Sequence, residues 1–130
     1  MHRYGRRVSM PKAINVLEKL ASIGDYWDPH IVADLNGQQV KLAKIRGVFD
    51  WHHHEAEDEL FFVVRGRFRL EFRDHVAEVE EGELIVVPRG VEHRPVAEEE
   101  CHILLFEPSG TLNTGNLLNA RTVAEPKRIS

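Results

Sequence analysis

Cysteine, long apolar runs and excess positive charge are all scarce in this sequence. Cys101 is the only cysteine, so no disulfide can form within the chain, and a reducing cytoplasm is the compartment we expect. No apolar run approaches membrane-spanning length, and none follows the basic first residues, so neither a membrane span nor a secretory signal is expected. The formal net charge of −4 gives no reason to expect nucleic acid or a membrane as a partner.

What remains is a chain of ordinary soluble composition. Its 130 residues, 42% of them hydrophobic, suit one domain with one core and are too few for two. We expect a leader and a helix over residues 1–29 and the main domain over residues 30–110. Residues 111–130 are expected to form a tail that packs on or near that domain.

Strand signals dominate the chain after residue 29. Before it, apolar residues at helical spacing predict one helix from Pro11 to Leu20, with Ser9 as a candidate cap and an end near Ile23. Asn36-Gly37 is a strong hairpin signal. The strands that we predict cover residues 30–35, 38–46, 60–64, 67–72, 76–79, 84–87 and 101–106, with the last two buried. Many short strands at close spacing are typical of a sandwich or a barrel.

Candidate metal ligands gather in residues 47–66, which read GVFDWHHHEAEDELFFVVRG. Alternate side chains of an extended segment share a face, so His52 and His54 point the same way and His53 points away. Imidazole and carboxylate are the usual ligands of divalent first-row metals. The acidic residues that follow the histidines offer a carboxylate that meets the two imidazoles if the chain bends between them.

A second stretch, residues 82–93, reads GELIVVPRGVEH and has a similar make-up. Its apolar strand ends at Pro88, and Arg89-Gly90 is a turn signal. His93 follows three residues after Gly90 and is placed to deliver a third imidazole. Two glycine-bounded segments, each a strand with histidine at its edge, are hard to explain by packing alone.

The first stretch resembles the first motif of the cupin superfamily, G-x5-H-x-H-x3or4-E-x6-G. It matches from His52 to Gly66, although only four residues separate Gly47 from His52. Glu59 takes the carboxylate position of the motif, and Asp58 fits only its shorter gap.

The second stretch resembles the second cupin motif, G-x5-P-x-G-x2-H-x3-N. It matches in register from Gly82 to His93, and Ala97 stands where the family has asparagine. The joint resemblance spans Val40 to Phe106, which is most of the chain.

This resemblance implies an all-β fold, an antiparallel cupin barrel of the double-stranded β-helix or jelly-roll type over residues 30–110, with a short N-terminal helix. It also implies one divalent transition metal inside the barrel. Iron and manganese fit the ligand set best, and nickel, cobalt, copper and zinc are compatible with it. The implied ligands are His52, His54, Glu59 and His93.

The remaining histidines and charged residues are interpreted as structural or solvated. Among the other histidines only His102 lies on a strand that could line a cavity, and residues 98–100 read as a solvated loop face. Glu55 and Glu57 are expected in solvent. An exposed or interfacial stripe is expected for Arg65, Arg67 and Arg69, which share one side of a strand, and contact with an anionic substrate is the alternative.

The resemblance does not imply one reaction, because cupins perform many. Three imidazoles and one carboxylate leave about two positions open in an octahedral site. Open positions favour an enzyme that acts on a small oxygenated molecule such as a sugar, diol or keto acid, by dioxygenase-type oxidation or by isomerisation. The alternative is a non-catalytic cupin that binds or senses a small molecule. No separate catalytic residue is assigned.

The strand from Leu60 to Val64 is apolar on both faces, whereas a small barrel has one interior. Its outer face therefore needs a cover. We expect a homodimer, which is also the commonest closed assembly, with cover by the chain's own N-terminal helix as the alternative.

Overall fold

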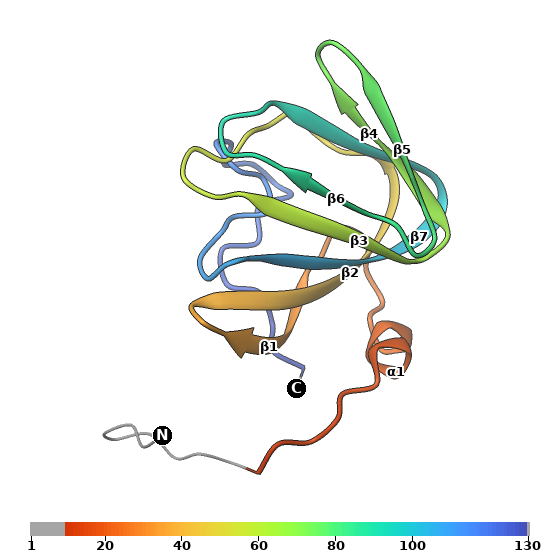
Figure 1. Cartoon of the computed structure of the whole chain (residues 1–130), viewed down its shortest axis with the longest axis vertical. Coiled ribbons are helices and arrows are strands. Elements are labelled where there is room, and N and C mark those ends of the chain that lie inside the picture. The colour runs from red at the N-terminus through yellow and green to blue at the C-terminus, as the bar shows by residue number, and fades with distance from the viewer. Residues whose placement is uncertain (1–9, 130) are drawn as a thin grey trace.

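The computed structural model of the protein describes residues 10–129, and Figure 1 shows one short helix and a seven-stranded antiparallel sheet. The fold class predicted from the sequence is confirmed in this respect. The elements are α1 (Val16–Ala21), β1 (His30–Leu35), β2 (Gln38–Val48), β3 (Glu59–Arg65), β4 (Arg67–Phe72), β5 (Val76–Glu80), β6 (Leu84–Val87) and β7 (His93–Pro108).

The long strand β7 ties the sheet together, since it pairs with three other strands. Its first part pairs with β4, where Phe72 lies opposite His93. Its last part pairs with β3, where Leu60 lies opposite Phe106, and β2 runs along most of its length. β3 also pairs with β6, so the strand that follows His52 and His54 is joined to the strand that precedes His93.

Gly66 makes the tight connection from β3 to β4. Its φ of 89° lies in the left-handed region, and a Cβ built there would lie 3.0 Å from the carbonyl oxygen of Glu100. Glycine is the residue that adopts this conformation without steric penalty, and here it also lets the turn approach β7. The connection places the inward faces of β3 and β4 over one apolar core, made of Val63, Phe68, Leu70, Val79 and Cys101 with further buried neighbours.

The helix is shorter than the sequence predicts. The predicted start at Pro11 is wrong, because residues 10–15 are not helical and α1 begins at Val16. Asn15 is the N-cap, and its side chain accepts a hydrogen bond from the Glu18 backbone N–H at 3.0 Å. A short polar side chain at this position satisfies an otherwise unpaired donor and fixes the start of the helix. The candidate cap Ser9 lies outside the described residues.

Two further expectations about strands are corrected. β6 is not fully buried, since Leu84 and Val86 are 58% and 50% exposed on its outer side. β7 begins at His93 instead of Cys101, so residues 98–100 belong to a strand and not to a loop. Their side chains are exposed, but their backbone continues the strand from its pairing with β4 to its pairing with β3.

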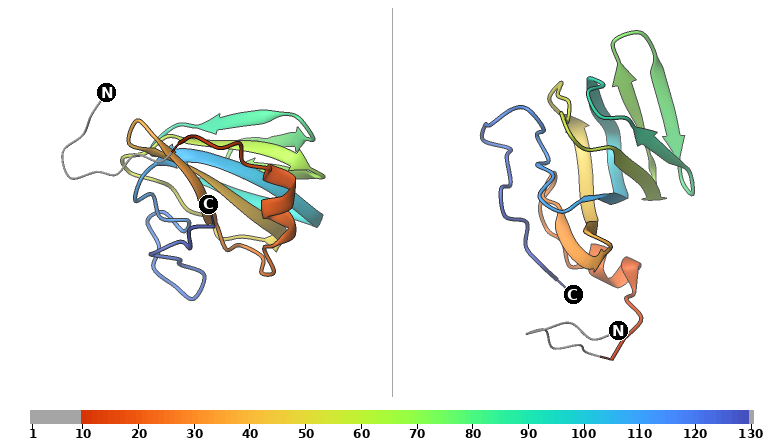
Figure 2. Two further views of the ribbon diagram at one scale, coloured as in Figure 1. Left: turned by 90° about the horizontal axis from the view of Figure 1, so that it is seen from below. Right: turned by 60° about the vertical axis from the view of Figure 1, so that its left-hand side comes forward.

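The C-terminal segment after β7 runs beside the sheet and returns towards β1, as both views of Figure 2 show. Near its end, Ile129 donates a backbone hydrogen bond to Ile31 at 3.0 Å. Within the described residues, no helix is long and apolar enough to cross a membrane.

Candidate metal centre

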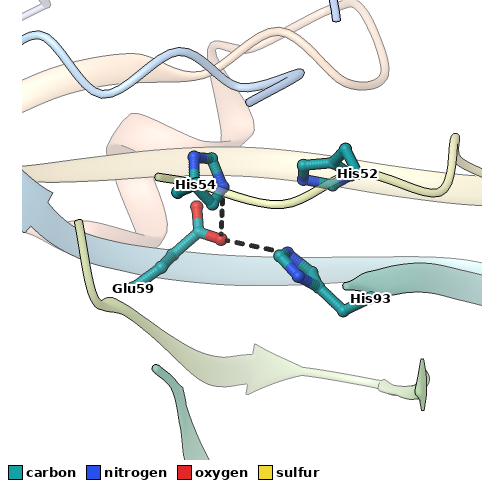
Figure 3. A group of neighbouring side chains, drawn as sticks. All are labelled: His52, His54, Glu59 and His93. Atoms are coloured by element: carbon teal, nitrogen blue, oxygen red, sulfur yellow. Dashed lines mark ion pairs between the residues drawn. The ribbon is translucent and has the colours of Figure 1, made fainter. Parts of the chain in front are cut away.

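Three chain segments bring four side chains together inside the sheet (Figure 3). His52 and His54 come from the loop between β2 and β3, Glu59 is the first residue of β3, and His93 is the first residue of β7. The backbones of His52 and His93 exchange two hydrogen bonds, of 3.0 Å and 2.9 Å, so the loop is docked directly on the start of β7. The fold therefore joins the two histidine stretches through main-chain pairing.

The potential ligand atoms of these four residues lie within 4.8 Å of one another. Glu59 Oε1 is 3.2 Å from His54 Nε2 and 3.5 Å from His93 Nε2, as the dashed lines in Figure 3 mark. All four residues are buried, with exposed fractions of 4% or less.

Several polar atoms of this cluster have no hydrogen-bond partner among the described residues. They are Glu59 Oε1, His93 Nε2 and both ring nitrogens of His54. Buried polar atoms are nearly always paired, and leaving one unpaired costs about 1–3 kcal/mol. A metal ion between them would satisfy the acceptor atoms together.

Two of the imidazoles are held in the tautomer that metal binding needs. His52 Nδ1 donates to the Asp50 carbonyl at 2.8 Å, and His93 Nδ1 donates to the Val91 carbonyl at 2.9 Å. Each ring therefore carries its hydrogen on Nδ1 and directs the lone pair of Nε2 into the cluster. Hydrogen bonds of this kind fix ring orientation and are typical of histidine ligands.

Burial and neighbouring charges set the protonation of the cluster. Burial, reinforced by the neighbouring His93, lowers the pKa of His52 from 6.5 to about 4, so this imidazole is neutral at pH 7. Burial lowers the pKa of His54 as well, but the Glu59 carboxylate outweighs it, and the net shift is upward. Burial would raise the pKa of Glu59, yet the His54 and His93 rings hold it well below its usual value. The carboxylate is thus ionised and its neighbours are imidazoles, which is the donor set of a divalent first-row metal.

A buried lysine and a buried glutamate lie next to Glu59 and are hydrogen-bonded to each other. Lys41 Nζ donates to Glu107 Oε2 at 2.6 Å and to the Thr111 carbonyl at 3.2 Å, and both side chains of the pair are 2% exposed. Burial and the charge of Glu59 raise the pKa of Glu107 well above its usual value. Glu107 therefore lies next to Glu59 as a weakly acidic group held in place by a lysine.

A cavity of about 40 Å³ opens beside the cluster, and His52 and Glu59 form part of its wall. The rest of the wall is apolar except for Asn113. The apolar lining consists of Trp27, Pro29, Ala43, Ile45, Phe49, Phe61, Pro95, Ile103 and Leu105.

The acidic and histidine neighbours of the cluster lie where they cannot join it. His53 points away from the other three imidazoles and contacts the Glu55 carboxylate at 2.5 Å. Asp58 pairs with Arg89 at the surface and accepts from its backbone N–H at 2.8 Å. His102 contacts Glu100 and does not line the cavity.

The predicted arginine stripe also lies away from the cavity. Arg65 and Arg67 are exposed, and Arg69 forms ion pairs with Glu71 and Glu98. None of the three lines the cavity beside the cluster.

Sequence reasoning missed several residues around the site. Trp27 carries no motif that marks it, but its ring lines the cavity and stacks on Phe49 with centroids 4.6 Å apart. Lys41, Glu107 and Asn113 had no motif to mark them, since their role depends on strand pairing across the chain. Lys41 alternates with the apolar Val40 and Leu42 in β2, a local pattern that favours an outward side chain, so nothing in the sequence marks its burial.

The chain belongs to the cupin family, since residues 36–107 match the family model described as Cupin domain. Uncharacterized protein YdbB of Bacillus subtilis (strain 168) is 31% identical over 86 residues, which cover 65% of this chain and 76% of that protein. The predicted family and the cupin fold are thus confirmed.

Two solved structures share both sequence and fold with this chain. A cupin-2 domain containing protein from Shewanella frigidimarina NCIMB 400 is 42% identical, with a TM-score of 0.72, over 73% of this chain and 93% of that chain. Protein NMB1881 from Neisseria meningitidis is 38% identical, with a TM-score of 0.69, over 75% of this chain and 100% of that chain. The names of these relatives state no reaction.

Proposed function

We propose that this protein is a metal-dependent enzyme that oxidises a small oxygenated substrate in a dioxygenase-type reaction. The ligands would be His52, His54, Glu59 and His93, with iron or manganese as the ion that suits them best. When bound, such an ion supplies redox chemistry and about two open positions for oxygen-containing groups. The donor set supports this proposal because it combines ionised carboxylate, neutral imidazole and unpaired buried atoms.

The residues that line the cavity favour oxidation over isomerisation. Isomerisation of a sugar or keto acid needs a side chain that takes and returns a proton within reach of the substrate. In the described residues, the only titratable side chains on the wall are His52 and Glu59, and both belong to the ligand set. An oxidation that draws on the ion and dioxygen makes no such demand, so the wall favours oxidation over isomerisation.

The rest of the wall limits what the site accepts. Phe49, Phe61, Ile103 and Leu105 exclude water and can pack on the hydrocarbon part of a substrate. A volume of about 40 Å³ holds only a few water-sized groups. The preferred substrate is therefore small, such as a diol or a keto acid, and places its oxygen atoms towards His52 and Glu59.

Dioxygen consumption tests this proposal. Protein loaded with Fe²⁺ or Mn²⁺ is placed in an oxygen electrode with a panel of diols, enols and keto acids, and His93→Ala serves as the inactive control. Uptake of dioxygen matched to loss of one substrate is the expected result. Binding of a panel compound without turnover would instead support a non-catalytic cupin, and an isomeric product without dioxygen uptake would support an isomerase.

We further propose that the protein is a homodimer that pairs through the outer face of β3 and β6. Leu84 and Val86 are 58% and 50% exposed, and across the sheet they lie opposite Phe62 and Leu60. A contiguous apolar face of this kind favours a protein partner. Sedimentation equilibrium is expected to give twice the chain mass for the wild type and one chain mass for Val86→Lys. A wild-type protein that stays at one chain mass on concentration would refute the dimer.

A further inference from the structure

The segment after β7 folds back over the loop that carries His52 and His54. We refer to residues 111–123 as the C-terminal strap. Among the hydrogen bonds between the strap and the loop, two fall on His53, the residue between the two histidine ligands.

Asn116 makes two hydrogen bonds to the backbone of His53. Its side-chain Oδ1 accepts from the His53 backbone N–H at 2.9 Å, and its own backbone N–H donates to the His53 carbonyl at 2.9 Å. This pair of bonds fixes the plane of the chain between His52 and His54. In an extended segment, that plane decides where the two flanking side chains point.

Gly115 brings the strap close enough for this grip. A Cβ built on Gly115 would collide with the carbonyl oxygen of His53 and lie 2.9 Å from His52 Cδ2. Its φ of 58° also lies in the left-handed region, which residues with side chains rarely adopt. Even a methyl group at this position must push the strap away from the histidine loop or tilt the His52 ring.

The strap is braced so that it can act as a rigid support. Asn113 donates to the Arg121 carbonyl at 2.8 Å and accepts from the Val123 N–H at 2.8 Å. The buried Thr114 hydroxyl donates to the Leu117 carbonyl at 2.7 Å. These bonds cross-link the strap to itself, in addition to its bonds to the loop.

The far part of the strap is tied to the same loop. Asn119 Nδ2 donates to the Asp50 carboxylate at 3.0 Å, and the Asp50 carbonyl accepts from His52 Nδ1. Arg121 donates to the Val48 carbonyl at 2.9 Å and lies over the Phe49 ring at 5.4 Å. The loop is therefore held from residue 48 to residue 53 by one continuous support.

We propose that the C-terminal strap is a positioning element of the metal centre, in which Gly115 and Asn116 set the directions of the His52 and His54 imidazoles through the His53 peptide. This inference rests on the proposed metal ligands. It assigns to a segment outside the family motifs a share of metal affinity, although none of its side chains belongs to the proposed ligand set. Loss of an outer partner of a metal ligand typically weakens binding about 10–100-fold.

The test is a titration of metal-free protein with Co²⁺, followed by chelator competition and by the visible absorption of the bound ion. Asn116→Leu keeps the size of the side chain but removes the acceptor for the His53 N–H, whereas Asn116→Asp keeps an acceptor. Asn15→Leu removes a comparable side-chain bond at the start of α1, away from the site, and is the matched control.

The expected result is Co²⁺ affinity lowered about 10–100-fold in Asn116→Leu and Gly115→Ala, with an altered Co²⁺ spectrum, and affinity close to wild type in Asn116→Asp and Asn15→Leu. A wild-type affinity and spectrum in folded Asn116→Leu would overturn the inference. Equal losses in Asn116→Leu and Asn15→Leu would also overturn it, because they would show an effect of stability alone. If the wild type itself bound no Co²⁺, the metal site would fail and not only the strap.

Discussion

Two regions of the interior, the apolar core and the cluster of candidate metal ligands, differ in the kind of side chain that they bury. In the apolar core, Val63, Phe68, Leu70 and Val79 are at most 3% exposed and contribute no polar side-chain atom. Burial raises the pKa of the neighbouring Cys101 to about 12, so its thiol stays neutral and behaves as one more core group. Along β3 the inward positions change from Val63 and Phe61 to Glu59, where the cluster of candidate metal ligands begins.

The contrast shows which region is explained by packing and which is not. Burial of apolar surface contributes about 25 cal/mol per Å² and accounts for the core by itself. The cluster of candidate ligands buries three imidazoles and a carboxylate with several polar atoms unpaired. Burying such atoms costs free energy, and apolar packing does not offset this cost. A sequence that only needed a stable sheet would fill these positions with apolar side chains. Binding of a metal ion would offset the cost of these unpaired atoms, whereas the apolar core needs no ligand.

The sharpest way to break this contrast is to remove the proposed ligands. His52→Ala, His54→Ala, Glu59→Ala and His93→Ala are each expected to weaken metal binding more than about 100-fold, because losing a ligand outweighs losing its outer partner. Chelator competition on the folded variants measures the effect. A variant that bound metal as well as the wild type would remove that residue from the ligand set.

A truncation in the apolar core is expected to do the reverse. Leu70→Ala should lower the free energy of unfolding of the metal-free protein by about 2–5 kcal/mol, since it leaves a cavity in a fully buried site. Urea unfolding measures this change. The metal affinity of the folded variant should match the wild type, and a large loss of affinity would show that the two regions are not independent.

Acid should separate the two regions as well. The folded pKa of His52 is lowered to about 4, so between pH 6.5 and 4 the unfolded chain takes up a proton that the folded chain does not. The stability contributed by His52 should therefore fall as pH falls through this window, by up to about 3 kcal/mol. The raised pKa of His54 acts above pH 6.5, whereas the raised pKa of Glu107 acts in the opposite direction within the window, so the His52 contribution is measured against a variant.

Urea unfolding at several pH values, compared between the wild type and His52→Gln, isolates this contribution. The variant should lose less stability on acidification. Parallel curves for the two proteins would contradict the neutral, buried state assigned to His52.

The smallest effects are expected from neighbours that look like ligands in the sequence. His53→Ala and Asp58→Ala should leave metal affinity nearly unchanged, since His53 points away and Asp58 pairs with Arg89 at the surface. The same chelator competition measures both. A loss in Asp58→Ala as large as that in Glu59→Ala would reassign the carboxylate.

The sequence predicted the parts of this molecule that local patterns encode. Strand alternation placed His53 opposite its neighbours, and the spacing of Glu59 and His93 selected the residues that the fold brings together. The strands β1 and β6 have the bounds predicted for them, because turn residues mark their ends clearly.

Features that depend on contacts across the chain were missed. The continuity of β7 through its acidic residues follows from pairing with β4 and β3, and overrides the local preference of a charged run for a loop. The place of Trp27 in the cavity wall follows from a hydrogen bond of its ring N–H to the Arg46 carbonyl at 3.0 Å. The strap was visible only as a polar stretch around Gly115, and its role depends on where the loop of His53 lies.

Metal analysis of the purified protein tests the central claim most directly. The protein is prepared without added chelator, its metal content is measured, and the stripped protein is titrated with Fe²⁺, Mn²⁺ and other divalent first-row ions. One such ion per chain, retained or rebound, is the expected result, with binding lost in His93→Ala. A folded wild-type protein that neither retains nor rebinds any of these ions would contradict it.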